Sequence, residues 1–418
     1  MICRLNIGHF KKGRVIALSF CLLFLAGCAS YQKQVFDARY RLVMRQPGLA
    51  AKALEPMAKK ESDDQLVFLL DYGIALHEQQ DFKMSNRALL AADQLVDFKD
   101  YISLSREGGS FLLSEGLVQY KGDPFEKVLI NAYLAINFLM LGDLEASAVE
   151  VRKLNQRLNF LRDEGEPEFV QSVFARYLGA MIWEEERNWD NAYIDYFKAH
   201  QIFPDFHYFK EDLVRAAYRA RRREDLKKWQ KKFPDVKVDR KKWKTQGELV
   251  VIYQQGWIPR KRPRPENPRF PKMFPVRTTT QFAGINIDNS RSGQTKPLFS
   301  IGRVAMKTIE DEFASLVARR LVGIAAKAVV ANQIGKQNKA LGQLAWAAMN
   351  AADQADTRQW STLPETVQIY KVWLKPGTYT VSFDGLNVYG KKSGESSTPV
   401  KVRIRPGKKT FMTWRSFR

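Results

Sequence analysis

Cysteine is scarce in this 418-residue sequence, which contains only Cys3, Cys21 and Cys28. Two of the three lie in residues 1–27, an N-terminal segment that we expect to be removed. One cysteine then remains, so the mature chain can form neither an internal disulfide framework nor a thiolate metal site. A catalytic cysteine is not expected either, because the remaining cysteine, Cys28, stands in a motif that predicts a covalent modification of its thiol.

Histidine is almost as rare, with four residues in the chain. Only His200 and His207 are near one another, and Pro204 between them breaks the helix that would align them. The metalloprotease, hydrolase-elbow, phosphate-loop and dinucleotide-binding motifs are all missing. We therefore predict a non-enzymatic protein with no catalytic residues, no cofactor and no metal. A deep pocket with clustered carboxylates of shifted pKa would point to an enzyme instead.

The N-terminus is basic, then apolar, and ends in Leu25-Ala26-Gly27-Cys28. The apolar run, residues 15–26, is short for a membrane span and typical of a secretory signal. The last four residues resemble the lipobox of bacterial lipoproteins, which implies a signal peptide at 1–27 and a covalent lipid anchor at Cys28. A plain secretion signal that ends by chance in cysteine is the alternative. The resemblance, with Ala29 rather than aspartate next, implies the outer membrane and a periplasm-facing protein.

Positive charge dominates, at +22 for the whole chain. Residues 1–27 carry four cations and no acids, so the mature chain keeps about +18. Such a field favours anionic partners, and an exported protein rarely meets nucleic acid. Phospholipid headgroups, lipopolysaccharide, peptidoglycan or an acidic protein are the expected ones. The alternative is that the charge only keeps the surface soluble.

Residues 28–244 have the apolar period of helices. Three stretches, at 70–92, 133–151 and 176–204, resemble the helix-turn-helix unit of tetratricopeptide repeats, and 211–234 is a poorer fourth. In the first, Gly73 and Ser85 are small enough to let two helices approach closely. We predict a solenoid of stacked helical hairpins, with a plain helical bundle as the alternative.

The concave face of such a solenoid commonly holds a peptide or a partner helix. A basic run from Arg215 to Lys228 lies near the end of this helical half. Within it, Arg221, Arg222 and Arg223 are candidate contacts for an acidic partner or an anionic surface. A solvated helix face is the alternative interpretation.

Residues 245–300 begin with a buried strand at 247–255 and continue into a segment rich in proline and arginine. Dense prolines favour an extended, exposed linker of polyproline II type. Its cations are the best candidate anion contacts in the chain, although a stiff spacer fits equally well. They are Arg260, Lys261, Arg262 and Arg264.

Residues 301–358 return to a helical pattern, and charged residues among its apolar ones argue against a membrane span. A packed helix pair that turns near Gly335 or Gly342 is expected. Residues 359–418 alternate as strands and are expected to pack with 247–290. The fold class is therefore mainly α, with a tetratricopeptide-like N-terminal solenoid and a C-terminal α+β domain containing a small antiparallel, sandwich-like sheet.

Two segments, Tyr120–Lys127 with the helix after it and Ala355–Pro364, resemble an uncharacterised family of bacterial tetratricopeptide-like lipoproteins. The strand that begins Gly247-Glu248-Leu249-Val250 supports the same resemblance, which implies an envelope lipoprotein but no known activity. In the second segment, Asp356, Arg358 and Trp360 form a candidate structural signature. We expect an ion pair and a tryptophan that pin a helix end to the sheet, or alternatively a ligand site.

Glu126 and Arg152 are a further candidate pair, buried between adjacent helices. Taken together, the sequence predicts a lipid-anchored, non-enzymatic scaffold that binds envelope proteins in the periplasm. The alternative is a protein that binds an anionic envelope polymer or lipid through its cationic surface.

Overall fold

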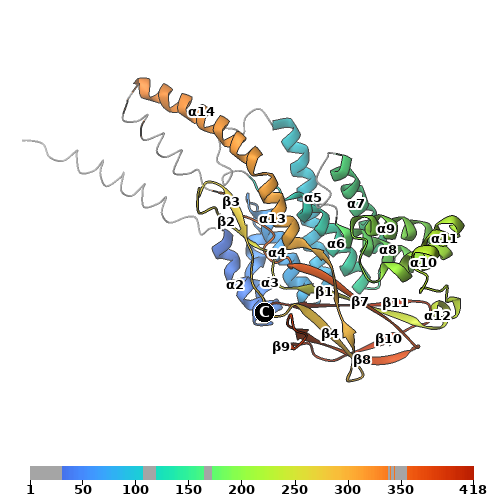
Figure 1. The fold of residues 1–418 in the computed structure, drawn as a ribbon. Coiled ribbons are helices and arrows are strands. Elements are labelled where there is room, and N and C mark those ends of the chain that lie inside the picture. The colour runs from blue at the N-terminus through green and yellow to red at the C-terminus, as the bar shows by residue number, and fades with distance from the viewer. Residues whose placement is uncertain (1–30, 107–118, 164–171, 338, 340–342, 344–354) are drawn as a thin grey trace, which may run out of the picture.

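The computed structural model describes residues 31–106, 119–163, 172–337, 339, 343 and 355–418. Its helices follow one another from α2 to α11, and the strands pack along one side of them (Figure 1). The structure confirms a mainly α fold with helical hairpins first and an α+β region second.

The helical half runs from α2 to α12, and two further helices lie between strands of the second half. The helices are α2 (Tyr31–Val43), α3 (Pro47–Lys59), α4 (Gln65–Glu78), α5 (Phe82–Arg106), α6 (Pro124–Met140), α7 (Leu144–Asp163), α8 (Val173–Glu185), α9 (Trp189–Ile202), α10 (Phe209–Arg219), α11 (Arg223–Lys232), α12 (Arg240–Thr245), α13 (Ile301–Asp311) and α14 (Phe313–Gln337).

One turn geometry joins the helices in pairs. The second residue after each first helix has a positive φ, between 58° and 77°, at Arg45, Gln80, Gly142, Arg187 and Arg221. Each of these residues donates its amide to the carbonyl three residues back, and the next residue donates to the carbonyl five back. This is the Schellman ending of a helix, which satisfies carbonyls that would otherwise lack a donor. Its recurrence defines five hairpins of the same build.

The spacing of these turns shows where the repeat is regular. Arg45 and Gln80 are 35 residues apart, and Arg187 and Arg221 are 34 apart, which matches the tetratricopeptide period of about 34. The two middle intervals are longer: α5 and α7 have 25 and 20 residues, and further chain separates them from the helices that follow. The hairpin of α2 and α3 was not predicted from the sequence, and the weak match at 211–234 proves to be the hairpin of α10 and α11.

Close helix approach within a hairpin follows the predicted small residues. A Cβ on Gly73 would lie 2.7 Å from Cδ2 of Leu89, so only glycine fits without a shift. The Ser85 hydroxyl donates to the Gly73 carbonyl at 2.7 Å. Ser147 makes the same bond to Ala135 at 2.8 Å in the next hairpin, so the two units are built alike.

The strands form a four-stranded sheet in the order β11-β1-β7-β6, a five-stranded sheet with the path β10-β8-β4-β5 and β9 on β8, and a two-stranded hairpin of β2 and β3. The strands are β1 (Gly247–Gln255), β2 (Arg260–Pro263), β3 (Pro271–Phe274), β4 (Phe282–Ile287), β5 (Ser290–Gln294), β6 (Lys296–Ser300), β7 (Thr366–Leu374), β8 (Gly377–Leu386), β9 (Lys392–Ser396), β10 (Val400–Ile404) and β11 (Lys409–Ser416).

Strand β1 lies between two cores and is buried along its whole length. Val250 and Ile252 belong to the large core shared with the helices. Leu249, Val251 and Tyr253 point to the other side, where they pack with the five-stranded sheet. The alternation of a strand thus gives three layers: helices, four-stranded sheet and five-stranded sheet.

Three details differ from the sequence predictions. β1 and β11 pair in parallel, whereas an antiparallel sheet was predicted. The proline-rich segment forms the antiparallel β2–β3 hairpin and is not a polyproline II linker; Pro263 and Pro271 face each other at its end. Helix α14 runs through Gly335 without a turn, and Gly342 lies outside the described residues.

The packing around β1 yields a stability prediction. A Cβ on Gly247 would lie 2.3 Å from the main-chain carbonyl oxygen of Arg405. β1 is paired on both edges, so it cannot move away. Gly247→Ala is expected to lower the free energy of unfolding by about 1–3 kcal/mol, measured by urea denaturation. Gly48→Ala is the control, because its Cβ would meet only the Gln79 side chain, at 3.4 Å. Equal effects of the two substitutions would contradict this account.

Candidate functional site

The first helix of every hairpin reaches the C-terminal half of the chain. These five helices, α2, α4, α6, α8 and α10, line the face of the array that covers the four-stranded sheet. The contacts are Arg39 over the Trp257 ring at 4.6 Å, Asp71 with Thr362, Glu126 with Trp360, and both Tyr177 and Asp212 with Lys371. The chain's own second half therefore fills the face of the solenoid that was predicted to hold a partner.

Asp71 on α4 is a buried acceptor in the seam, by which we mean the contact between these five helices and the C-terminal half of the chain. It accepts hydrogen bonds from the hydroxyls of Tyr31, Ser361 and Thr362 and from the Thr362 amide, the last at 2.9 Å. Burial raises the pKa of Asp71, although these donors oppose the shift. The carboxylate thereby ties α2, α4 and residues 361–362 together.

Glu126 on α6 holds the neighbouring residue of the same segment. It accepts the Trp360 amide at 2.7 Å and the Tyr120 hydroxyl, and burial raises its pKa to about 7. The predicted Glu126–Arg152 pair is wrong, because Arg152 is exposed and its guanidinium lies over the Trp183 ring at 5.5 Å. Glu126 instead binds the main chain at Trp360, which belongs to the other half of the chain.

The signature residues Asp356, Arg358 and Trp360 lie in the same seam. Arg358 binds Asp356 at 2.6 Å and Asp64, just before α4, at 2.8 Å. Trp360 is fully buried and its ring is 5.7 Å from that of Tyr133. The ion pair joins this segment to Asp64 before α4, and the tryptophan ring packs against α6.

A charge cluster of six buried groups joins the far end of the array to the sheet. Its side chains are at most 5% exposed. They are Glu184, Asp212, Arg215, Glu248, Lys371 and Lys409, which come from α8, α10, β1, β7 and β11. Three carboxylates and three cations balance, so the cluster carries no net charge.

The geometry of the charge cluster is closely interlocked. Arg215 donates to Glu184 at 2.8 Å and to Asp212 at 2.6 Å. Lys409 bridges Glu184, at 2.7 Å, and Glu248. Lys371 contacts Glu248 at 3.1 Å and also Asp212, so each of the six groups has a partner of opposite charge within the cluster. Burial alone would raise the pKa of Glu248, but Lys371, Lys409 and Arg215 outweigh it and hold the pKa at about 2.

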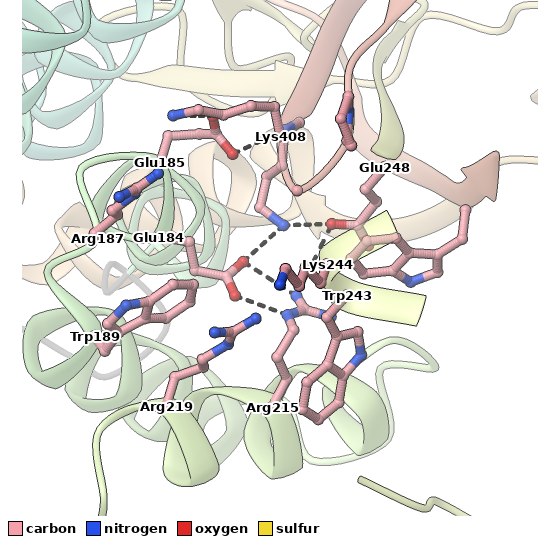
Figure 2. A pocket seen from close by; sticks show the side chains of 14 residues that line it. Glu184, Glu185, Arg187, Trp189, Arg215, Arg219, Trp243, Lys244, Glu248 and Lys408 are labelled. Carbon is pink, nitrogen blue, oxygen red and sulfur yellow. Dashed lines mark hydrogen bonds and ion pairs between the residues drawn. The ribbon is translucent and has the colours of Figure 1, made fainter. Parts of the chain in front are cut away.

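A pocket of about 550 Å³ opens beside this cluster, between α8, α10 and the ends of β1, β7 and β11. Figure 2 shows Arg215 and Arg219 rising from the same helix toward its centre, with Glu184 facing them. Three tryptophans, Trp189, Trp243 and Trp373, line it together with further lysine and arginine side chains. It is thus a cationic pocket with aromatic walls.

The pocket is lined by three carboxylates, Glu184, Glu185 and Glu248. Burial raises the pKa of Glu185, but the other two are held in the ionised form, which argues against acid–base work by them. Burial would raise the pKa of Glu184, yet Arg215 and Lys409 hold the pKa well below its usual range. Both its oxygens accept hydrogen bonds, from Arg215 and from the Tyr196 hydroxyl. Glu248 is held as a carboxylate in the same way. Neither group is poised to exchange a proton near neutral pH.

The predicted basic patch divides between surface and core. Arg221 and Arg223 are exposed, Arg221 at the turn of the last hairpin. Arg222 pairs with Asp190 at 2.8 Å and lies over the Tyr193 ring at 4.8 Å. Arg215, the start of the predicted run, is buried in the charge cluster and is no surface contact.

The prediction that Arg260, Lys261, Arg262 and Arg264 are exposed is wrong for two of them. Lys261 is buried and pairs with Asp123 at 3.1 Å, and Arg264 is buried and pairs with Glu310 at 2.9 Å. Arg260 is partly buried and Arg262 is exposed. The β2–β3 hairpin packs against the helices, so half of these cations serve structural pairs.

Cys28 lies outside the described residues. Within the described part of the chain, no group of three or more histidine, cysteine, aspartate or glutamate side chains is arranged to hold a metal ion. Sequence analysis missed the charge cluster and the tryptophans because their partners lie far apart in the chain. One local signal existed: Glu248 and Lys371 are the charged residues of strands that are otherwise uncharged and largely buried.

Comparison with known proteins leaves the chain without a family. No family model matches it, and no curated protein matches it. Among solved structures, MamA from Desulfovibrio magneticus RS-1 is 14% identical with a TM-score of 0.30, covering 47% of this chain and 88% of its own. The TPR2AB domain of yeast Sti1, solved with pHSP90, is 16% identical with a TM-score of 0.21, covering 49% and 78%. These TM-scores are too low to support the fold. The repeat assignment rests instead on the five Schellman turns at Arg45, Gln80, Gly142, Arg187 and Arg221.

The charge cluster gives a prediction about pH. Glu248→Gln leaves Lys371 and Lys409 buried without one of their partners, and is expected to cost about 3–5 kcal/mol at pH 7. The pKa of Glu248 is lowered on folding, so this stabilisation is present above pH 4.5 and is lost as the pH falls toward 2. Urea denaturation at pH 7, 5 and 3.5 should show the gap between variant and wild type closing in acid.

The control for this experiment is Glu145→Gln, which removes an exposed carboxylate and should leave stability unchanged. A gap for Glu248→Gln that stays constant across this pH range would show that its ionised form is not what stabilises the seam.

Proposed function

We propose that this protein is a bacterial envelope lipoprotein that scaffolds other envelope proteins. It is anchored in the outer membrane by a lipid on Cys28, faces the periplasm and works without catalysis. The single observation that carries the proposal is the filled solenoid face. The helical array and the sheets form one body, linked by Asp71, Glu126 and the charge cluster. Such a body is a platform for partners on its outside.

The closed seam changes where a partner would bind. A solenoid commonly holds its ligand on the concave face, but here that face buries β1 and residues 359–363. A partner therefore binds the outer surface and meets the protein at a fixed distance from the anchor. A fixed distance is what a scaffold needs in order to place one protein relative to a membrane.

The position of α2 supports anchoring at Cys28. The described part of α2 starts at Tyr31, three positions after Cys28, and three residues of chain span at most about 10 Å. Phe36 and Tyr40 on α2, with Met44 just after its end, form an apolar stripe and are 61%, 53% and 42% exposed. We infer that this stripe lies against the bilayer, where it would be shielded from water. None of the described helices is both long and apolar enough to cross a membrane.

The alternative function, binding of an anionic envelope polymer or lipid, depends on cations that are free to face outward. Exposed cations such as Arg262 and Arg223 are available, but Lys261 and Arg264 are not. Salt separates the two proposals, because binding through exposed charges weakens steeply as ionic strength rises. A partner held by apolar contacts persists.

The anchor and the partner can be tested together by crosslinking in intact cells with the wild type and Cys28→Ala. Wild type should fractionate with outer membranes after a salt wash and capture a defined protein that remains bound at high salt. Cys28→Ala should appear in the soluble fraction and lose that partner. If the wild type captures no protein but binds cell-wall sacculi in a salt-sensitive way, the scaffold proposal fails. Cys28→Ala that remains on washed membranes would refute the anchor.

Orientation on the membrane has its own test, because a lipidated Cys28 leaves the mature chain without a free thiol. Tyr40→Cys should react slowly with a membrane-impermeant maleimide in lipid vesicles and rapidly in the soluble Cys28→Ala background. Lys231→Cys, on exposed α11, is the matched control and should react rapidly in both. Equal rates for Tyr40→Cys in the two settings would show that the stripe does not face the bilayer.

A further inference from the structure

The pocket beside the charge cluster contains hydrogen-bond donors that lack acceptors. Nη1 of Arg215, Nε of Arg219 and Nε1 of Trp373 are buried and have no hydrogen-bond partner in the described structure. The nearest acid to Arg215 Nη1 is Glu211, at 4.0 Å, which is too long for a hydrogen bond. Buried polar atoms are mostly satisfied in native proteins. Thirteen lack a partner among the described residues, and three of these belong to residues that line this one pocket, so their grouping points to a ligand.

Charge balance points to the sign of that ligand. The three carboxylates of the charge cluster are matched by its own three cations. The pocket is also lined by Arg187, Arg219 and Lys244, for which the described residues provide no ion pair. The remaining acid, Glu185, pairs with Lys408 at 3.7 Å. The pocket therefore has an excess of positive charge that an anion would neutralise.

The tryptophans hold the guanidinium groups in place. Arg219 lies over the Trp189 ring at 5.3 Å, and Arg215 lies over the Trp373 ring at 5.5 Å. Both arginines come from α10 and are one helical turn apart, and their side chains point into the pocket (Figure 2). A guanidinium fixed on an aromatic face keeps its planar fork free for an oxyanion, which it can bind through two oxygens.

We propose that this pocket binds the oxyanion group, carboxylate or phosphate, of a small ligand, with Arg219 as its main contact and Arg215 and Trp373 as further donors. The volume of about 550 Å³ suits a ligand of metabolite size. The site is independent of the scaffold function, since it needs neither the lipid nor a protein partner. The oxyanion has two possible sources, a soluble compound or a lipid headgroup.

Titration calorimetry on the full-length protein in a neutral detergent tests the proposal. The probes are glucose 1-phosphate and glucuronate, with glucose as the uncharged match, and micelles that contain phosphatidylglycerol. At least one anionic probe should bind at physiological salt, while glucose should not. Preference for a soluble probe identifies a soluble ligand, and binding of the doped micelles alone identifies a headgroup.

Two variants locate the binding. Arg219→Gln removes the positive charge, keeps a shorter polar side chain, and should weaken binding about tenfold, the value of one charge-assisted hydrogen bond. Trp373→Phe keeps the ring and removes only the Nε1 donor, and should weaken binding by a smaller factor. Arg223→Gln is the control, because it removes the same charge from an exposed site outside the pocket. The proposal is overturned if no anion binds, or if Arg219→Gln and Arg223→Gln bind alike.

Discussion

The structure depends on a buried, balanced set of charges between two halves of one chain. Glu184, Asp212 and Arg215 come from the helices, and Glu248, Lys371 and Lys409 come from three adjacent strands. An ion taken out of water costs several kcal/mol, and only well-placed partners repay that cost. If the helices separated from the sheet, charged side chains on both sides would lose their partners. Partial separation is therefore unfavourable in free energy.

The remaining contacts along the seam follow the same logic with fewer charges. Asp71 and Glu126 each present a buried carboxylate to residues 360–362 and satisfy main-chain amides there. These amides belong to a segment with no sheet partner, so without the carboxylates they would be buried and unsatisfied. Polar groups of this kind fix one position where apolar packing would allow several. The helical array thus fixes the position of the C-terminal half of the chain.

Local sequence predicted the local structure well. Apolar periodicity placed the hairpins, and small residues such as Gly73 marked where helices meet closely. The first hairpin was not predicted, although its turn at Arg45 has the same backbone geometry as the other four. The parallel pairing of β1 with β11 joins residues about 160 positions apart, and no short-range pattern records it. The charge cluster was missed for the same reason, since each of its pairs except Arg215–Asp212 crosses a long stretch of chain.

Net charge alone misled the choice of site. In the basic stretch 260–264, Lys261 and Arg264 form ion pairs with Asp123 and Glu310 and are therefore not available to a partner. Cations without acids gather instead where the seam ends, around the pocket, where Arg219 comes from the basic run that begins at Arg215 and Lys244 comes from the basic stretch 240–244. A positive group left beside a neutral cluster is destabilised by its own partial burial, and Arg219 bears this cost in the absence of a ligand. A bound anion would offset that cost, because it would supply acceptors to Arg215 and Arg219 and balance their charge.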